Sequence, residues 1–318
     1  MKTAIVTKYG GPEVIQIVEA PKPSPKPNQI LIKIKAFGVT SGDVRIRSAS
    51  FPKGFTIPGK LALGIFGPRN KVLGSEFSGI VEEIGSEVSS FKPGDKVMGF
   101  RVFNIYGEYA CIKEQDAIIL MPENLSFEEA ASIPFGASTA LHFLNMAALK
   151  PAQTVLINGA SGSVGSNAVQ IANSMNADIT GVCSGKNSDF VKSLGAKEII
   201  DYKTVELKNI ANKYDVIFDT VGNLRFDDYK HLLNNGGTFL QAVSTFGELF
   251  AKKIREDDKK FLTGTASEKK EDLLVLNKLI LDGKLKPSLD KIFKFEDIAK
   301  AHEYVETGRK RGGVVVVF

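Results

Sequence analysis

The chain has 318 residues, of which 43% are apolar and 24% are charged. This length and composition predict a globular protein of two domains, or of one large domain, with ample core. The net charge of +5 is mild and spread along the chain, so it does not predict nucleic-acid binding.

Two cysteines, Cys111 and Cys183, lie far apart in the sequence. They form no disulfide framework, which is typical of a protein of the reducing cytoplasm. The first residues resemble a strand rather than a secretion signal. No apolar run approaches the about 20 residues that a membrane-spanning helix needs. We therefore expect a cytoplasmic protein without a membrane span.

The first part of the chain is expected to be mostly β. Turn sequences rich in glycine and proline separate short strand-like runs. These runs are residues 4–7, 14–18, 30–36, 79–83, 96–100, 108–112 and 117–120.

The pattern changes at Ser126, which with Glu129 forms the capping box of a helix. Strands and helices then alternate, and this predicts a parallel, doubly wound sheet with right-handed crossovers. The expected strands are 154–158, 178–183, 198–201, 215–219 and 238–242, and the expected helices are 163–175, 189–194, 227–233 and 269–281. The final run 312–318 is so apolar that it must be a buried strand, which we assign to the sheet of the first part.

Residues 158–165, here called the glycine turn, join the strand 154–158 to a helix. A strand, a tight glycine turn and a helix N-terminus form a pyrophosphate site of dinucleotides. The helix N-terminus presents unpaired N–H groups and partial positive charge, and Gly162 leaves room for the phosphates to reach them. Gly165 lets the helix pack closely on the strand, whereas Ala160 replaces the first glycine of the usual motif.

The residues just after the expected strand 178–183, the second strand of the parallel sheet, indicate which dinucleotide is expected. An NAD enzyme usually has an acidic residue there, but this chain has Ser184 and Lys186, and no acid before Asp189. An ammonium group attracts the 2′-phosphate of NADPH, which a carboxylate would repel. We therefore expect NADPH. The alternative is that Lys186 is one of many surface lysines.

Six segments together resemble the medium-chain dehydrogenases/reductases, in particular their zinc-free quinone oxidoreductase (zeta-crystallin-like) branch. They are 35–43 (KAFGVTSGD), 73–79 (LGSEFSG), 91–97 (FKPGDKV), 130–140 (AASIPFGASTA), 158–165 (NGASGSVG) and 214–222 (YDVIFDTVG). The resemblance covers essentially the full length. It implies an α/β protein with a GroES-like β domain (1–121 and 265–318), a Rossmann NADP-binding domain (122–264) and an active-site cleft between them. It also implies a homodimer.

The resemblance also implies roles for particular residues. Those expected to contact the cofactor phosphates are Ser161, Gly162, Ser163, Val164 and Gly165. Those expected around the adenosine phosphate are Ser184, Lys186 and Tyr202, although Tyr202 could also be a simple turn aromatic. Thr139 is expected beside the nicotinamide, and Val221, Val243 and Ser244 around its ribose.

The positions that match the zinc ligands of related alcohol dehydrogenases are Thr40 or Ser41, Ser75 and the region of Ser138. Hydroxyl groups are poor ligands of zinc, and two cysteines cannot form a four-cysteine structural lobe. The three histidines are scattered and are interpreted as surface or packing residues: His142, His231 and His302. We expect no metal.

Without a metal, the expected substrates accept hydride into a conjugated system, as quinones and α,β-unsaturated carbonyls do. The enzyme must then orient the acceptor and donate hydrogen bonds to its oxygen, and Thr40, Ser75 and Thr139 are the candidate catalytic residues. Glu76 and Asp43 are interpreted as bracing the cleft or the ribose. No strong general acid is visible, so water is one possible proton source.

Two alternatives stay open: a non-catalytic NADPH-binding protein, crystallin-like or RNA-binding, and an alcohol or aldehyde oxidoreductase of the same superfamily. The absence of a basic strip studded with aromatic residues argues against RNA binding. A short-chain dehydrogenase is rejected because the only Tyr-x-x-x-Lys, at 109–113, lies upstream on a strand. The apolar run 51–70 could cap a hydrophobic substrate, form a partner or membrane-surface patch, or fold into the core.

Overall fold

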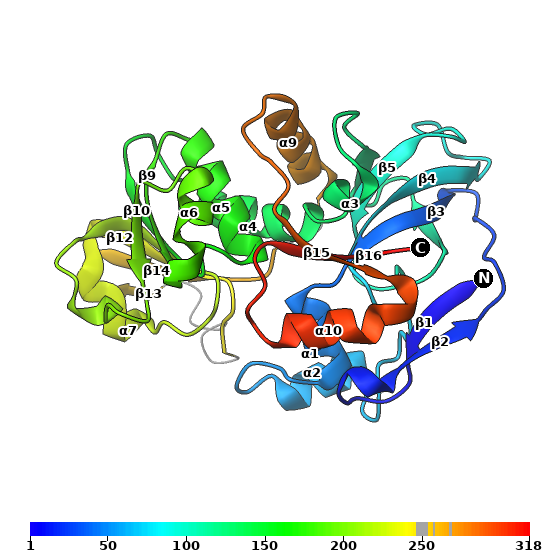
Figure 1. Cartoon of the computed structure of the whole chain (residues 1–318), viewed down its shortest axis with the longest axis horizontal. Helices are drawn as coiled ribbons and strands as arrows, with labels where there is room; N and C mark the ends of the chain where they lie inside the picture. Colours follow the sequence, from blue (N-terminus) through cyan, green and yellow to red (C-terminus); the bar gives the residue numbers. More distant parts are fainter. Residues whose placement is uncertain (246–253, 257, 267–268) are drawn as a thin grey trace.

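A computed structural model describes residues 1–245, 254–256, 258–266 and 269–318. Among these residues the strands form two large sheets and one separate pair. The two sheets lie at opposite ends of the molecule, and the helices α4 (Pro134–Met146) and α9 (Lys270–Leu281) lie between them (Figure 1).

The first sheet has the order β15-β16-β3-β4-β5-β7, and β6 also pairs with β3. All its pairs are antiparallel except β15 with β16. Its strands are β3 (Gln29–Gly38), β4 (Glu76–Ile84), β5 (Lys96–Phe100), β6 (Tyr109–Lys113), β7 (Ile118–Leu120), β15 (Leu289–Lys294) and β16 (Gly313–Val317). The separate antiparallel pair is β1 (Lys2–Val6) with β2 (Ile15–Glu19).

The expectation for the end of the chain is confirmed. Strand β16 lies between β15 and β3, and its Val314, Val315 and Val316 are buried. The sequence therefore returns to the first sheet after the second sheet is complete, as the red strand beside the blue one shows in Figure 1.

The second sheet has the order β10-β9-β8-β11-β12-β14-β13 and is parallel except for β13. This is the doubly wound arrangement that the alternation predicts, with β8 at the point where the strand order reverses. Its strands are β8 (Thr154–Asn158), β9 (Asp178–Cys183), β10 (Glu198–Asp201), β11 (Tyr214–Asp219), β12 (Leu233–Gln241), β13 (Ile254–Glu256) and β14 (Lys259–Thr263). The helices associated with it include α5 (Ser163–Ser174), α6 (Ser188–Ser193) and α7 (Phe226–Tyr229).

The helix expected at Ser126 is much shorter than a typical helix. Ser126 and Glu129 form both hydrogen bonds of the capping box, but α3 covers only Phe127–Ala130. Pro134 then begins the separate helix α4, because proline has no N–H to continue the preceding turn and suits a first helical position. The β-rich part also contains helices that were not among the expected elements: α1 (Ser41–Ser48), α2 (Thr56–Leu63) and, near the end of the chain, α10 (Ile298–Glu306).

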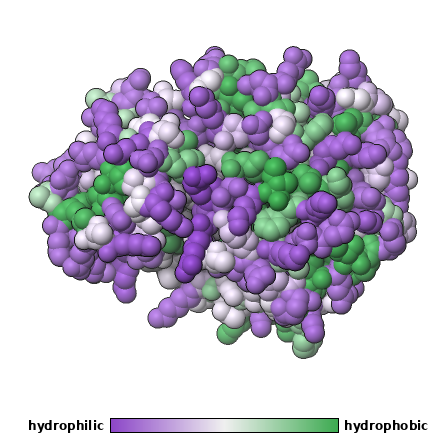
Figure 2. Space-filling model, viewed as in Figure 1, coloured by the Kyte–Doolittle hydropathy of each residue, from purple (hydrophilic) through white to green (hydrophobic). Residues whose placement is uncertain are grey.

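The apolar run 51–70 does not fold into the core along its whole length. It contains α2, and its Ile57 and Phe66 are 75% and 91% exposed. Leu61 and Ile65 are exposed as well, so the core interpretation is wrong for these four side chains. Figure 2 shows apolar side chains at the lower edge of the molecule, where α2 lies in Figure 1.

The domain boundaries at 121/122 and 264/265 stay a prediction. One apolar cluster contains Met98 and Ile119 from before the first boundary, and Leu273 and Leu276 from after the second. The core is therefore continuous across both positions. Among the described residues, no helix is both long and apolar enough to cross a membrane.

Candidate active site

The glycine turn follows β8 and leads directly into α5. A Cβ on Gly165 would lie 2.1 Å from the carbonyl oxygen of Gly159, so the close contact of helix and strand requires glycine there. A Cβ on Gly162, which is the N-cap of α5, would meet only that same oxygen, at 3.4 Å. Space is therefore open in front of the helix N-terminus, where a phosphate would bind.

The residues present fit a dinucleotide pyrophosphate. Ser161, Gly162, Ser163 and Val164 are half-buried around the N-terminus of α5, whose partial positive charge favours an anion. Gly162 offers no side-chain cap, so the first N–H groups of the helix stay available. The hydroxyl of Ser161 accepts a hydrogen bond from the Asn187 side chain at 3.0 Å, which connects the turn to the loop after β9.

Ser184 and Tyr202 lie near each other because β9 and β10 pair in parallel and end together. The backbone N–H of Tyr202 donates to the carbonyl of Cys183, and Lys186 is exposed beside them. Sequence reasoning missed Asp201 at the end of β10. Its carboxylate would lie 2.6 Å from a Cβ on Gly185. An acidic group therefore borders the loop after β9, although that loop has no acid of its own before Asp189.

Val221 and Val243 lie at the carboxyl ends of β11 and β12, and Gly222 lies against Val243. The loop after β11 is held by Asp219, which is fully buried. Its carboxylate accepts hydrogen bonds from the backbone N–H groups of Val221, Gly222 and Leu224 and from the side chain of Asn158. Ser244 is buried next to this loop.

Thr40 and Ser75 come together although they are 35 positions apart. Their hydroxyl oxygens are 3.5 Å apart, and both hydroxyls donate to Oδ2 of Asp43, at 2.7 and 3.3 Å. Thr40 is also the N-cap of α1, and with Asp43 it forms a capping box. Burial raises the pKa of Asp43, while the hydrogen bonds from Thr40 and Ser75 act in the opposite direction.

Glu76 lies next to this hydroxyl pair and reaches the other half of the molecule. Its Oε2 accepts a hydrogen bond from the backbone N–H of Phe135, at the start of α4. Burial raises the pKa of Glu76 to about 8. The hydrogen bond from Phe135 and the charge of Lys310 lower it, whereas Asp43 raises it further.

Thr139 lies one turn further along α4 and is buried. Its hydroxyl donates to the carbonyl oxygen of Phe135 at 2.8 Å. In this orientation it can accept a hydrogen bond from a ligand but has no proton left to donate. Helix α4 contacts the glycine turn closely, because a Cβ on Gly136 would lie 2.5 Å from the hydroxyl oxygen of Ser163.

The segment before β16 also reaches the glycine turn, which sequence reasoning did not predict. The backbone N–H of Gly312 donates to the carbonyl of Ser161 at 2.9 Å, and Gly312 and Gly162 form a parallel bridge. The ammonium group of Lys310 donates to the carbonyl of Gly312 at 2.8 Å. Burial lowers the pKa of Lys310 to about 8, although Glu76 and Asp290 raise it.

Among residues 1–245, 254–256, 258–266 and 269–318, no three His, Cys, Asp or Glu side chains are grouped as metal ligands. Cys111 and Cys183 are free thiols. Of the histidines, His142 is half-buried, His231 is exposed and His302 is completely buried.

Two family models match separate parts of the chain, on either side of residues 126–193. The model described as "Alcohol dehydrogenase GroES-like domain" matches residues 26–125, and the model described as "Zinc-binding dehydrogenase" matches residues 194–316. The first match spans β3 to β7 of the first sheet. The second match spans β10 to β14 of the second sheet and continues through β15 into β16 of the first.

Similar proteins cover the whole chain. A quinone oxidoreductase of Sus scrofa is 31% identical over 100% of this chain and 97% of its own length. The chain belongs to the medium-chain dehydrogenases/reductases, in their zinc-free quinone oxidoreductase branch.

The solved quinone oxidoreductase of Coxiella burnetii superimposes on this member of the family with a TM-score of 0.88. The two chains are 32% identical over 100% of this chain and 99% of the other. A chloroplastic NADPH-dependent alkenal/one oxidoreductase of Arabidopsis thaliana is 28% identical over 99% of this chain and 79% of its own length. Dehydrogenases of this superfamily use a nicotinamide dinucleotide, and the open glycine turn fits that cofactor class. The individual residue assignments stay predictions.

Proposed function

We propose that this protein is a zinc-independent, NADPH-dependent oxidoreductase that transfers a hydride to a quinone or an α,β-unsaturated carbonyl. The observation that carries the proposal is the pair of hydroxyls on Asp43. The resemblance implies that Thr40 or Ser41, and Ser75, replace zinc ligands of related alcohol dehydrogenases. The hydroxyl oxygens of Thr40 and Ser75 are 3.5 Å apart, beside Glu76, which binds the start of α4. The similarity to quinone and alkenal/one oxidoreductases supports the same reaction class.

The bound nicotinamide would supply the hydride, and the chain would supply orientation and hydrogen bonds. A conjugated acceptor suits this site because negative charge moves to a distant oxygen, which a hydroxyl donor can stabilise without a metal. Both hydroxyls donate to Asp43, but Ser75 is the better candidate donor. Its hydrogen bond to Asp43 is longer, at 3.3 Å against 2.7 Å for Thr40, and Thr40 also caps α1. Thr139 would border the nicotinamide and accept a hydrogen bond from it.

NADPH is proposed on the basis of Lys186, which is exposed at the end of the loop after β9. Ser161, Gly162, Ser163, Val164 and Gly165 would hold the pyrophosphate, Ser184 and Tyr202 the adenosine phosphate, and Val221, Val243 and Ser244 the nicotinamide ribose. A homodimer is also part of the proposal, on the basis of the family resemblance. A cytoplasmic location is proposed from the two distant, free cysteines.

The test is the consumption of NADPH with an ortho-quinone, a para-quinone and an enone. We expect turnover with at least one of them. NADPH binding without turnover on any acceptor would favour a binding protein, and oxidation of simple alcohols with NADP⁺ would favour an alcohol oxidoreductase.

A variant comparison then tests the site. Ser75→Ala should lower kcat by roughly tenfold or more, because it removes one donor to the developing oxyanion. Ser174→Ala is the matched control, since it removes a hydroxyl that only donates to a carbonyl within α5. Equal activity of the two variants would contradict the proposed role of Ser75.

A further inference from the structure

Behind the hydroxyl pair lies a group of buried polar side chains that the proposed function has not yet used. Asp43, Arg47, Tyr106 and His302, here called the inner cluster, are each at most 3% exposed. Asp43 and Arg47 come from α1, Tyr106 from the loop before β6, and His302 from α10. Helices α1 and α10 pack against each other, so these elements enclose the cluster.

The inner cluster contains five buried polar atoms without a hydrogen-bond partner among the described residues. They are the hydroxyl of Tyr106, both ring nitrogens of His302, and Nε and Nη1 of Arg47. A buried polar atom without a partner loses its hydrogen bonds to water without replacement, so five such atoms in one place are unusual in a native protein. Buried water usually satisfies such atoms when two to four polar groups surround it.

Interactions between neighbouring members lead from the hydroxyl pair to the surface. The Tyr106 hydroxyl lies beside the Asp43 carboxyl without the geometry of a direct hydrogen bond, and Gly74 makes room for the Tyr106 ring under the Ser75 turn. The rings of Tyr106 and His302 meet edge to face, with centroids 5.6 Å apart.

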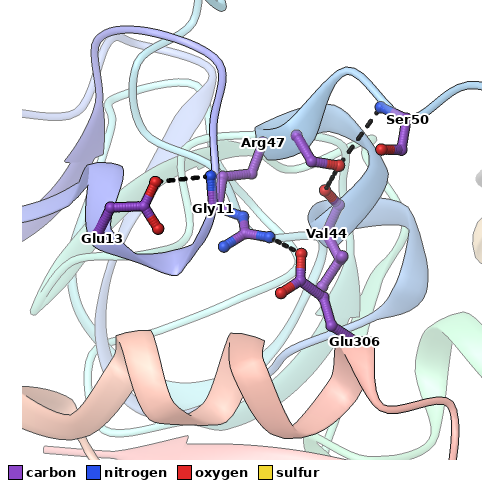
Figure 3. Close-up of polar contacts among 7 residues, drawn as sticks. Gly11, Glu13, Val44, Arg47, Ser50 and Glu306 are labelled. Atoms are coloured by element: carbon purple, nitrogen blue, oxygen red, sulfur yellow. Dashed lines mark hydrogen bonds and ion pairs between the residues drawn. The ribbon is translucent and has the colours of Figure 1, made fainter.

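At the outer end Arg47 forms an ion pair with Glu306, which lies one turn after His302 on α10. Figure 3 shows the guanidinium group of Arg47 pointing from α1 to this carboxylate. The side chain of Glu306 is 34% exposed, so it connects the cluster with solvent.

We propose that the inner cluster is a proton-delivery route, in which buried water links Glu306, His302 and Tyr106 to Asp43 and so reprotonates the hydroxyl of Ser75. This proposal rests on the proposed reduction of a quinone or enone. Tyr106, His302 and Glu306 are positioning residues, because they would act through Asp43 and Ser75.

The route supplies the one proton that the reduced acceptor takes up. The hydride carries two electrons into a new bond on the acceptor, and the displaced electron pair leaves a negative charge on the acceptor oxygen. The step requires the protonated Asp43 carboxyl, which donates to Ser75 so that the Ser75 hydroxyl can turn to the acceptor. Ser75 gives the acceptor oxygen one proton, Asp43 passes its own proton to Ser75, and Tyr106 and His302 restore the proton of Asp43 through water. Glu306 takes the replacement from solvent. One hydride and one proton are used for each acceptor.

The chemistry of each group suits this task. Burial and the charge of Arg47 lower the pKa of His302 to about 3, so its ring is neutral and has one donor and one acceptor nitrogen. A neutral ring can accept a proton on one side and release one on the other. The charged and titratable groups around the route are Asp43, Arg47, Glu76, Tyr106, His302 and Glu306.

Tyr106→Phe tests the route because it removes one hydroxyl and keeps the ring. Its matched control is Tyr214→Phe, since the Tyr214 hydroxyl is also buried and unpartnered but lies in the second sheet. We expect Tyr106→Phe to lower kcat roughly tenfold or more with little change in the KM for NADPH. The solvent deuterium isotope effect on kcat should increase, because proton transfer becomes slower than hydride transfer.

A second measurement needs neither substrate nor cofactor. In protein labelled with ¹⁵N-histidine, NMR reports how fast the ring N–H of His302 exchanges with water, and His302→Gln assigns the signal. Glu306→Gln should slow this exchange at least tenfold, whereas Glu303→Gln, an exposed neighbour on α10, should leave it unchanged.

Two results would overturn the route: an unchanged isotope effect in Tyr106→Phe, or equal His302 exchange in the Glu306→Gln and Glu303→Gln proteins. Failure of the wild-type protein to reduce any acceptor would instead contradict the proposed function. The exchange experiment separates the two cases because it does not depend on turnover.

Discussion

The backbone N–H of Gly312 donates a hydrogen bond to the carbonyl oxygen of Ser161 across 2.9 Å. The two residues are far apart in the chain, and they join the returning C-terminal segment to the turn that would hold the cofactor pyrophosphate. Lys310 strengthens this junction, since its ammonium group binds the carbonyl of Gly312. The glycine turn is thus fixed from the side of the β-rich part as well as by its own sheet.

Gly312→Ala should weaken this junction. Gly312 has φ +80, and a Cβ would lie 2.0 Å from the carbonyl oxygen of Ser288. We expect a loss of unfolding free energy of more than about 1 kcal/mol and a higher Kd for NADPH, measured by denaturant titration and cofactor fluorescence. Gly283→Ala is the control, since Gly283 has φ +68 but no atom within 4 Å of a Cβ. Equal effects of the two substitutions would mean that backbone strain alone, and not the contact, is responsible.

The two glycines at the start of α5 should respond differently to alanine. Gly165→Ala places a Cβ 2.1 Å from the carbonyl oxygen of Gly159, so it should destabilise the fold by a few kcal/mol. Gly162→Ala meets that atom only at 3.4 Å, so the protein should fold normally and bind NADPH more weakly. Thermal unfolding and cofactor titration separate these effects. Normal NADPH affinity in Gly162→Ala would place the pyrophosphate elsewhere.

The choice between NADPH and NADH should depend on Lys186 and Asp201. Lys186→Glu should raise the KM for NADPH far more than that for NADH, because a carboxylate repels the 2′-phosphate. Lys192→Glu, at an exposed position of α6, controls for the change in net charge. Asp201→Asn should shift the preference further toward NADPH. Equal effects of Lys186→Glu on both cofactors would show that Lys186 is only a surface lysine.

The raised pKa of Glu76 should make the unfolding free energy of the protein fall as the pH rises. Its pKa in the folded protein is about 8, above the ordinary value of 4.5. The protonated carboxyl therefore contributes stability that is complete below about pH 4.5 and is lost as the pH rises through 8. Glu76→Gln keeps an acceptor for the Phe135 N–H but does not ionise, so its unfolding free energy should fall less between pH 5 and about 9. Parallel stability curves for both proteins would mean that Glu76 is not protonated in the fold.

The sequence by itself determined individual helices, strands and turns, because each of them depends on residues that are close together in the chain. The capping residues Ser126 and Glu129 marked a helix start, the glycines of residues 158–165 marked a turn between strand and helix, and the valines of β16 required burial. The resemblance implies hydroxyl residues, Thr40 or Ser41 and Ser75, at the positions of zinc ligands, and their poor affinity for zinc follows from residue type alone. The apolar run 51–70 shows the limit, because hydrophobic residues are not always inside.

Only the tertiary structure decided which distant residues meet. The contact of Asp201 with Gly185 depends on the parallel register of β10 with β9, and that of Gly312 with Ser161 depends on the return of the chain between the two sheets. The inner cluster likewise needs α1 packed against α10, which brings Arg47 to Glu306 and encloses His302. Periodicity and motifs describe neighbours along the chain, whereas burial, pKa shifts and shared hydrogen bonds arise from packing between segments.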